Sequence, residues 1–138
     1  MIRVIGVGSP FGADQLGWMA IDHLATLGLV ECELLKLDRP GSRLLDHFRD
    51  VSSVVVIDAV AVNDRPGGVS ALSLSDLQQI QCTPSSHGFG LAETLALGGQ
   101  LGKLPTDFHL IGIHTGETLS AVPILDLASL EALVLPLI

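Results

Sequence analysis

Short apolar runs alternate along the chain with segments whose apolar residues recur at helical spacing. The apolar runs predict strands at residues 2–8, 30–37, 54–58, 69–72 and 108–113. Helical spacing predicts helices at 14–27, 44–48, 75–79, 91–99 and 126–135. Strands that alternate with helices pair in parallel through right-handed crossovers. The pattern therefore predicts an α/β fold, a three-layer sandwich with a mostly parallel central sheet of the phosphorylase/hydrolase-like kind.

Glycine, proline and polar residues mark the boundaries between these elements. Turns are predicted at 38–41 (D-R-P-G) and 63–68 (N-D-R-P-G-G), so the short run at 69–72 suits an edge strand. Residues 82–90 are rich in turn formers and predict an irregular segment before the next helix. Asp126 is expected to cap the last helix, which Pro136 ends.

The composition suits one compact domain spanning residues 1–138. Hydrophobic residues make up 48% of the chain and charged residues only 16%, which favours a sheet covered on both faces. Fifteen acidic residues against seven basic ones give a formal charge of −8, and no basic run occurs. Because nucleic-acid binding depends on clustered Lys and Arg, this balance argues against a nucleic-acid partner.

Cysteine usage and hydropathy indicate the compartment. Cys32 and Cys82 form no C-x-x-C pair, so we expect reduced, buried thiols and no zinc ribbon. The apolar start is broken by Gly6 and Gly8 and has no cleavage site typical of a signal peptide. The apolar C-terminal stretch is shorter than the roughly 20 residues that span a bilayer. We therefore expect a cytoplasmic protein with no membrane segment.

Polar side chains stand where two predicted strands end. Ser9 follows the first strand and Asp58 ends the strand at 54–58, and such carboxyl ends border the crevice where α/β proteins bind ligands. Gln15, at a helix start, and His87, in the irregular segment, are expected at the same edge. Gln15, Asp58 and His87 would offer two oxygens and one nitrogen to a divalent ion and leave positions open for a reacting partner.

A structural interpretation of the same three residues is open as well. Asp58 would then bond loop amides, His87 would pack under a helix start, and Gln15 would be a solvated first-turn residue. Spacing alone favours these structural roles. His114, which follows a strand, is a secondary candidate for the crevice, although a hydrogen bond to a backbone carbonyl is the simpler expectation for it.

Two other kinds of chemistry receive little support. In a G-x-G-x-x-G dinucleotide motif that begins at Gly6, the third glycine falls on Phe11, so a nucleotide-binding module is a weak alternative. Ser85 and Ser86 adjoin His87, but the G-x-S-x-G elbow of a serine hydrolase is missing.

Five motifs in order resemble the maturation endopeptidases of nickel-iron hydrogenases, and the likeness runs through most of the chain. They are G-V-G-S with D-Q-L-G at 6–9 and 14–17, D-R-P-G at 38–41, D-A-V with P-G-G-V at 58–60 and 66–69, S-S-H at 85–87 before a leucine-rich helix, and L-I-G-I at 110–113. In that family three residues contact the metal. They are the acid at the second position of a D-[DE] pair, which corresponds to residues 14–15 here, the acid of D-A-V and the histidine of S-x-H. The resemblance places these roles on Gln15, Asp58 and His87.

The chain departs from the family pattern at two of these positions. Glutamine replaces the acid at position 15, and Ser9 replaces an asparagine. A neutral amide leaves one anion where the family has two, so a divalent ion is expected to bind more weakly. Asp14 is expected to cap the first helical turn and not to replace the missing ligand.

The resemblance implies an endopeptidase that removes the C-terminal peptide of a nickel-loaded hydrogenase large-subunit precursor. Nickel, or another divalent metal, would arrive with that substrate and dock on the three residues, with Asp58 and His87 in catalysis. The alternative is a noncatalytic relative that binds the metal and precursor without cutting, because Gln15 replaces the acidic ligand.

Overall fold

A computed structural model describes residues 1–81 and 90–138 of the chain. In this part of the chain, one sheet contains five strands, with the order β2-β1-β3-β5-β4. The strands are β1 (Ile2–Gly8), β2 (Cys32–Asp38), β3 (Ser53–Val60), β4 (Val69–Leu72) and β5 (Asp107–His114). The first four strands in the sheet order run parallel, and β4 pairs with β5 antiparallel. The predicted mostly parallel sheet and the edge position at 69–72 are confirmed.

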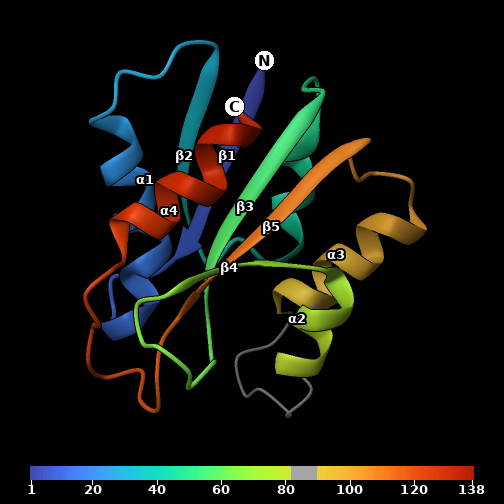
Figure 1. Cartoon of the computed structure of the whole chain (residues 1–138). Coiled ribbons are helices and arrows are strands. Elements are labelled where there is room, and N and C mark those ends of the chain that lie inside the picture. Colours follow the sequence, from blue (N-terminus) through green and yellow to red (C-terminus); the bar gives the residue numbers. More distant parts are fainter. Residues whose placement is uncertain (82–89) are drawn as a thin grey trace.

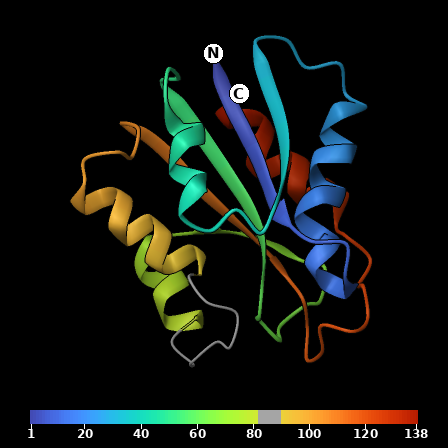
Figure 2. The same cartoon turned by 180° about the vertical axis from the view of Figure 1, so that it is seen from behind.

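Helices cover both faces of this sheet. They are the α-helices α1 (Leu16–Ala25), α2 (Leu74–Ile80), α3 (Leu91–Gln100) and α4 (Leu127–Val134), and the 3-10 helices η1 (Gly12–Gln15), η2 (Gly41–Phe48) and η3 (Leu135–Leu137). Helices α1 and α4 pack on one face, and η2, α2 and α3 pack on the other (Figures 1 and 2). The three-layer α/β sandwich predicted from the sequence is thus confirmed. No helix in the described residues is long and apolar enough to cross a membrane.

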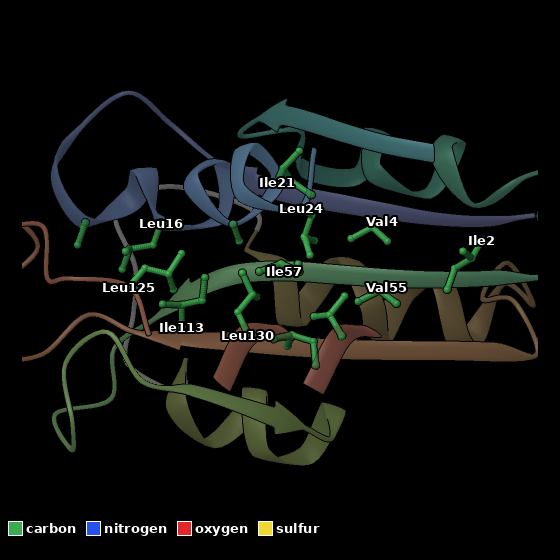
Figure 3. Close-up of a cluster of buried hydrophobic side chains, with 14 residues drawn as sticks. Ile2, Val4, Leu16, Ile21, Leu24, Val55, Ile57, Ile113, Leu125 and Leu130 are labelled. Carbon is green, nitrogen blue, oxygen red and sulfur yellow. The ribbon is translucent and has the colours of Figure 1, made fainter. Parts of the chain in front are cut away.

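Successive side chains of the central strands point to opposite faces of the sheet, so the hydrophobic core has two parts, one on each face. On β3, Val55 and Ile57 face α1 and α4, whereas Val54, Val56 and Val60 belong to the cluster beneath η2 and α3. Figure 3 shows the first of these clusters, in which side chains from α1 and α4 meet residues of the central strands. Because β3 is buried on both faces, its continuous apolar run predicts the strand well.

Several boundaries differ from the sequence-based ones. The first helical segment begins as η1 and becomes α-helical only at Leu16, and α3 continues through Gly98 and Gly99 to Gln100. Asp126 caps α4 as expected, since its carboxylate accepts a hydrogen bond from Ser129 N at 3.1 Å. Cys32 is only half-buried, contrary to the expected buried thiol, although desolvation still raises its pKa.

Three glycines allow the start of α1 to lie directly on the strands. A Cβ on Gly17 would collide with the carbonyl oxygen of Val7 on β1 and lie 3.0 Å from that of Ile57 on β3. Side chains at Gly6 and Gly8 would collide with the carbonyl oxygens of Gly17 and Asp14. The glycine pattern therefore serves backbone packing between a strand end and a helix start.

Gly17→Ala is expected to lower the free energy of unfolding by about 2–4 kcal/mol, because the new methyl group meets rigid backbone. In an open helix the same substitution stabilises by up to about 1 kcal/mol. Gly99→Ala in α3 is the matched control, since its Cβ would find only Leu104 Cδ1 at 3.7 Å. Urea unfolding of both variants measures the difference. Equal effects of the two substitutions would show that α1 does not need this close approach.

Candidate functional site

The candidate site lies at the carboxyl ends of β1 and β3, two neighbouring strands between which the order of strands in the sheet changes direction. From β1 the chain adds β2 on one side, and β3 lies on the other side of β1. In open α/β sheets, ligands bind outside the carboxyl ends of the strands at this reversal. Asp58 lies near the end of β3 there, buried with only 9% of its surface exposed. The predicted position of Asp58 near the carboxyl end of a buried strand is confirmed, and its part in a ligand site stays a prediction.

Helix η1 brings Gln15 and Asp14 to the same edge. It packs against β3 and directly precedes α1. Backbone hydrogen bonds fix the turn: Ser9 N donates to Asp14 O at 3.1 Å, and Ala13 N donates to Leu119 O at 2.8 Å. Gln15 and Asp14 are both partly buried. The structure thus places two of the three predicted metal-contacting residues, Gln15 and Asp58, on adjoining elements.

The Asp58 carboxyl group is held in its protonated form at neutral pH. Desolvation by burial, the larger cause, and the negative charge of Asp14 together raise its pKa from 3.8 to about 8. A hydrogen bond with the Ala59 backbone opposes the shift. Asp58 is therefore neutral until a cation or base arrives.

Asp14 does not have the role predicted for it. No side chain caps the start of η1 or of α1, where Phe11 and Gln15 occupy the capping positions. The predicted capping role of Asp14 is therefore wrong. Asp14 lies inside the 3-10 turn, and its charge acts on Asp58. The sequence analysis considered Asp14 only as a cap and missed its effect on Asp58, although its place beside Gln15 in the motif was a usable signal.

His87, the third predicted site residue, lies in residues 82–89, outside the described part of the chain. The residues that flank this segment are held together, because Gln81 Oε1 accepts a hydrogen bond from Ala92 N at 3.1 Å. Gly90 is the N-cap of α3, which packs on the same face of the sheet as Val56 and Val60. Because side chains alternate along a strand, Asp58 belongs to that same face.

His114 has a structural role at the end of β5. Its side chain is buried, with Nδ1 2.6 Å from the Asp64 carbonyl oxygen and Nε2 2.8 Å from Ser70 Oγ. Since a carbonyl oxygen only accepts, Nδ1 donates to Asp64 O, and Nε2 shares a hydrogen bond with the serine hydroxyl. The expected hydrogen bond to a backbone carbonyl is confirmed, and it fastens the turn after β3.

Other histidines form pairs that the sequence did not reveal. His23 on α1 lies 2.8 Å from a Glu131 carboxylate oxygen on α4, and His109 lies 2.6 Å from one of Asp107. Within residues 1–81 and 90–138, no three His, Cys, Asp or Glu side chains gather into a metal site. Gln15 and Asp58 offer an amide and a carboxylate oxygen, a donor pair that suits a cation held mainly by another molecule.

Asp58→Asn is expected to raise the free energy of unfolding by about 1–3 kcal/mol at pH 7. Because the pKa of Asp58 is higher in the folded protein, its stabilising contribution is complete below pH 3.8 and is lost as the pH rises through about 8. The difference between variant and wild type should therefore grow from pH 5 to pH 8 in urea unfolding. Asp46→Asn, at a side chain 68% exposed, is the control. A difference that does not vary with pH would contradict the shifted pKa.

Comparison with known proteins identifies the family. A family model described as hydrogenase maturation protease matches residues 32–124, more than half of the chain. No curated protein matches the chain. Among solved structures, a hydrogenase maturating endopeptidase from E. coli is 24% identical, covers 98% of this chain and 85% of its own, and has a TM-score of 0.68. A NiFe hydrogenase maturation protease from Thermococcus kodakarensis is 22% identical, with 99% of both chains covered and a TM-score of 0.67.

A third structure, a hydrogenase 2 maturation peptidase from a Thaumarchaeota archaeon, is 26% identical over 95% of this chain and 88% of its own, with a TM-score of 0.57. These likenesses agree with the three-layer fold, and the match to the family model agrees with the motifs in the sequence. The chain belongs to the hydrogenase maturation proteases, a family of peptidases.

Proposed function

We propose that this protein removes the C-terminal peptide of a nickel-loaded hydrogenase large-subunit precursor in the cytoplasm. The observation that carries the proposal is the buried carboxyl group of Asp58 at the strand-order reversal, beside η1. The match to the hydrogenase maturation protease family supports the substrate class.

In this proposal, nickel is part of the substrate and meets Gln15, Asp58 and His87. A neutral Asp58 makes the free site weakly attractive to cations from solution. When a cation held by the precursor approaches, it favours the charged form of Asp58, and the proton leaves. The site then discriminates a loaded precursor from an empty one by electrostatics.

The docked ion would position or polarise the scissile amide, and Asp58 or His87 would help to activate water. Burial of Asp58 strengthens each of these electrostatic interactions, because less water screens them. Gln15 contributes an amide oxygen without charge. Asp14 adds negative charge nearby, since it acts electrostatically on Asp58.

The substitution at position 15 supports a second candidate, a relative that binds the loaded precursor without cutting it. A glutamine oxygen coordinates a cation without the attraction of a carboxylate, so docking is weaker than with an acid at this position. The two candidates differ in a single readout, the release of the C-terminal peptide.

Incubation with a nickel-loaded precursor, followed by mass spectrometry, is expected to show loss of the C-terminal peptide. Asp58→Asn and His87→Ala should each lower the cleavage rate by about 100-fold or more, in the range seen when a general acid or base is removed. Asp46→Asn and His109→Ala are the controls, and a precursor without nickel should stay intact. Bound but uncut precursor would favour the noncatalytic binder. Full activity of an Asp58→Asn/His87→Ala double variant would remove the site assignment.

Gln15→Glu is expected to tighten binding of the nickel-loaded precursor by about 3- to 10-fold at low salt, because it adds a second anion at the docking position. Gln100→Glu introduces the same charge at an exposed residue that ends α3 and should leave affinity unchanged. Affinity measured by calorimetry for loaded and empty precursor separates the metal contribution. A gain equal for both precursors would argue against metal docking at residue 15.

A further inference from the structure

Exposed apolar side chains occur on two loops whose backbones are in contact next to η1. Among the described residues, nine large hydrophobic side chains are exposed, and five of them lie at position 11 or within 119–127. Phe11 follows β1 and is 67% exposed, and Leu119 lies in the loop after β5 and is 59% exposed. We call Phe11 and Leu119 the apolar rim. Monomeric proteins seldom leave such side chains grouped on the surface unless they bind a partner.

Backbone contacts join the two loops of the apolar rim into one unit. Ala13 N donates a hydrogen bond to Leu119 O at 2.8 Å. Gly12, with φ +52°, lies so close to the Leu119 carbonyl that any side chain would collide with it. The blue segment at η1 and the orange-red segment before α4 accordingly lie side by side in both views of the molecule (Figures 1 and 2). The rim therefore sits on a fixed backbone.

Arg39 adds a positive charge to the apolar rim. Its guanidinium carbon lies 5.7 Å from the centre of the Phe11 ring, while its Nε donates to Asp38 Oδ1 at 2.7 Å. The Arg39 backbone N donates to Gly8 O at 3.0 Å, which anchors the turn to the end of β1. Arg39 has φ +41°, a conformation that favours glycine.

The charge of the chain restricts what can bind this surface. A second copy or an anionic membrane would meet a molecule with a formal charge of −8 and be repelled. Asp14 adds a negative charge near the same edge, so a strongly acidic partner would be repelled as well. A peptide with one bulky apolar side chain and one carboxylate fits, because the apolar rim and Arg39 lie side by side.

We propose that the apolar rim and Arg39 hold the segment of the large-subunit precursor that lies next to its scissile bond. An apolar side chain of that segment packs on Phe11 and Leu119, and a carboxylate approaches the exposed side of the Arg39 guanidinium. This inference rests on the proposed function. Asp14 is only three residues beyond Phe11, so an extended peptide of a few residues, at about 3.3 Å per residue, links the rim to the site.

Phe11→Ala and Leu119→Ala are each expected to weaken binding of the nickel-loaded precursor by about 10-fold and to raise KM, with kcat nearly unchanged. Arg39→Gln should do the same, and Arg39→Lys should restore part of the loss, because it keeps the charge without the planar group. Val30→Ala, at a residue 79% exposed near the opposite ends of the strands, is the control. Calorimetry compares each variant in the Asp58→Asn background with Asp58→Asn alone, so that the loss of this carboxylate is common to both, and cleavage assays give the kinetic constants.

The outcomes separate the rim from the proposed function. Precursor that binds through Phe11 and Leu119 but stays intact would support the binding role of the apolar rim and overturn the proposed cleavage. If both alanine variants are folded by circular dichroism and cleave the precursor with unchanged KM, the binding role of the apolar rim is overturned, whereas the proposed cleavage is supported. Absence of any precursor binding to the folded wild type would overturn both. If Phe11→Ala unfolds the protein, Leu119→Ala and Arg39→Gln decide the question.

Discussion

The close approach between the start of α1 and the ends of β1 and β3 determines the rest of the site. Gly17 lies against carbonyl oxygens from both strands, and Gly6 and Gly8 leave the room that this approach needs. The result is that η1 lies over the strand-order reversal, with Asp14 and Gln15 next to β3. Asp58 is buried near this strand end, on the face of the sheet that η2 and α3 cover.

That burial joins stability and function in one side chain. A carboxyl group with a pKa of about 8 is neutral in the folded protein at pH 7 but ionised in the unfolded chain, so folding must take up a proton and stability falls as the pH rises above 3.8. A cation reverses this preference, because the charged carboxylate is then favoured. The stability cost of this buried acid and its response to a cation therefore have one cause, the low exposure of Asp58.

The fold was largely predictable because its signals are local. The β-branched run at 54–57 has the length and composition of a buried central strand, and turn formers delimit most of the other elements. The capping role predicted for Asp14 was wrong because tertiary contacts of η1 with β3 and with Leu119 set the geometry of that turn. A helix start judged from sequence alone contains no such contacts.

The candidate site was predictable in part. Strand ends identify Asp58, and motif spacing identifies Gln15, but the electrostatic effect of Asp14 on Asp58 depends on three-dimensional proximity. The pairing of His114 with Asp64 and Ser70 likewise joins residues far apart in sequence. The role of His87 stays a prediction, since it lies outside the described residues.

The positive φ of Arg39 links backbone geometry to the choice of side chain at this turn. Glycine would relieve the backbone and add stability, but it would also remove the guanidinium group from the face of the Phe11 ring. The Arg39 side chain is 63% exposed. Exchange of this side chain therefore alters the surface of the turn and leaves the buried core undisturbed.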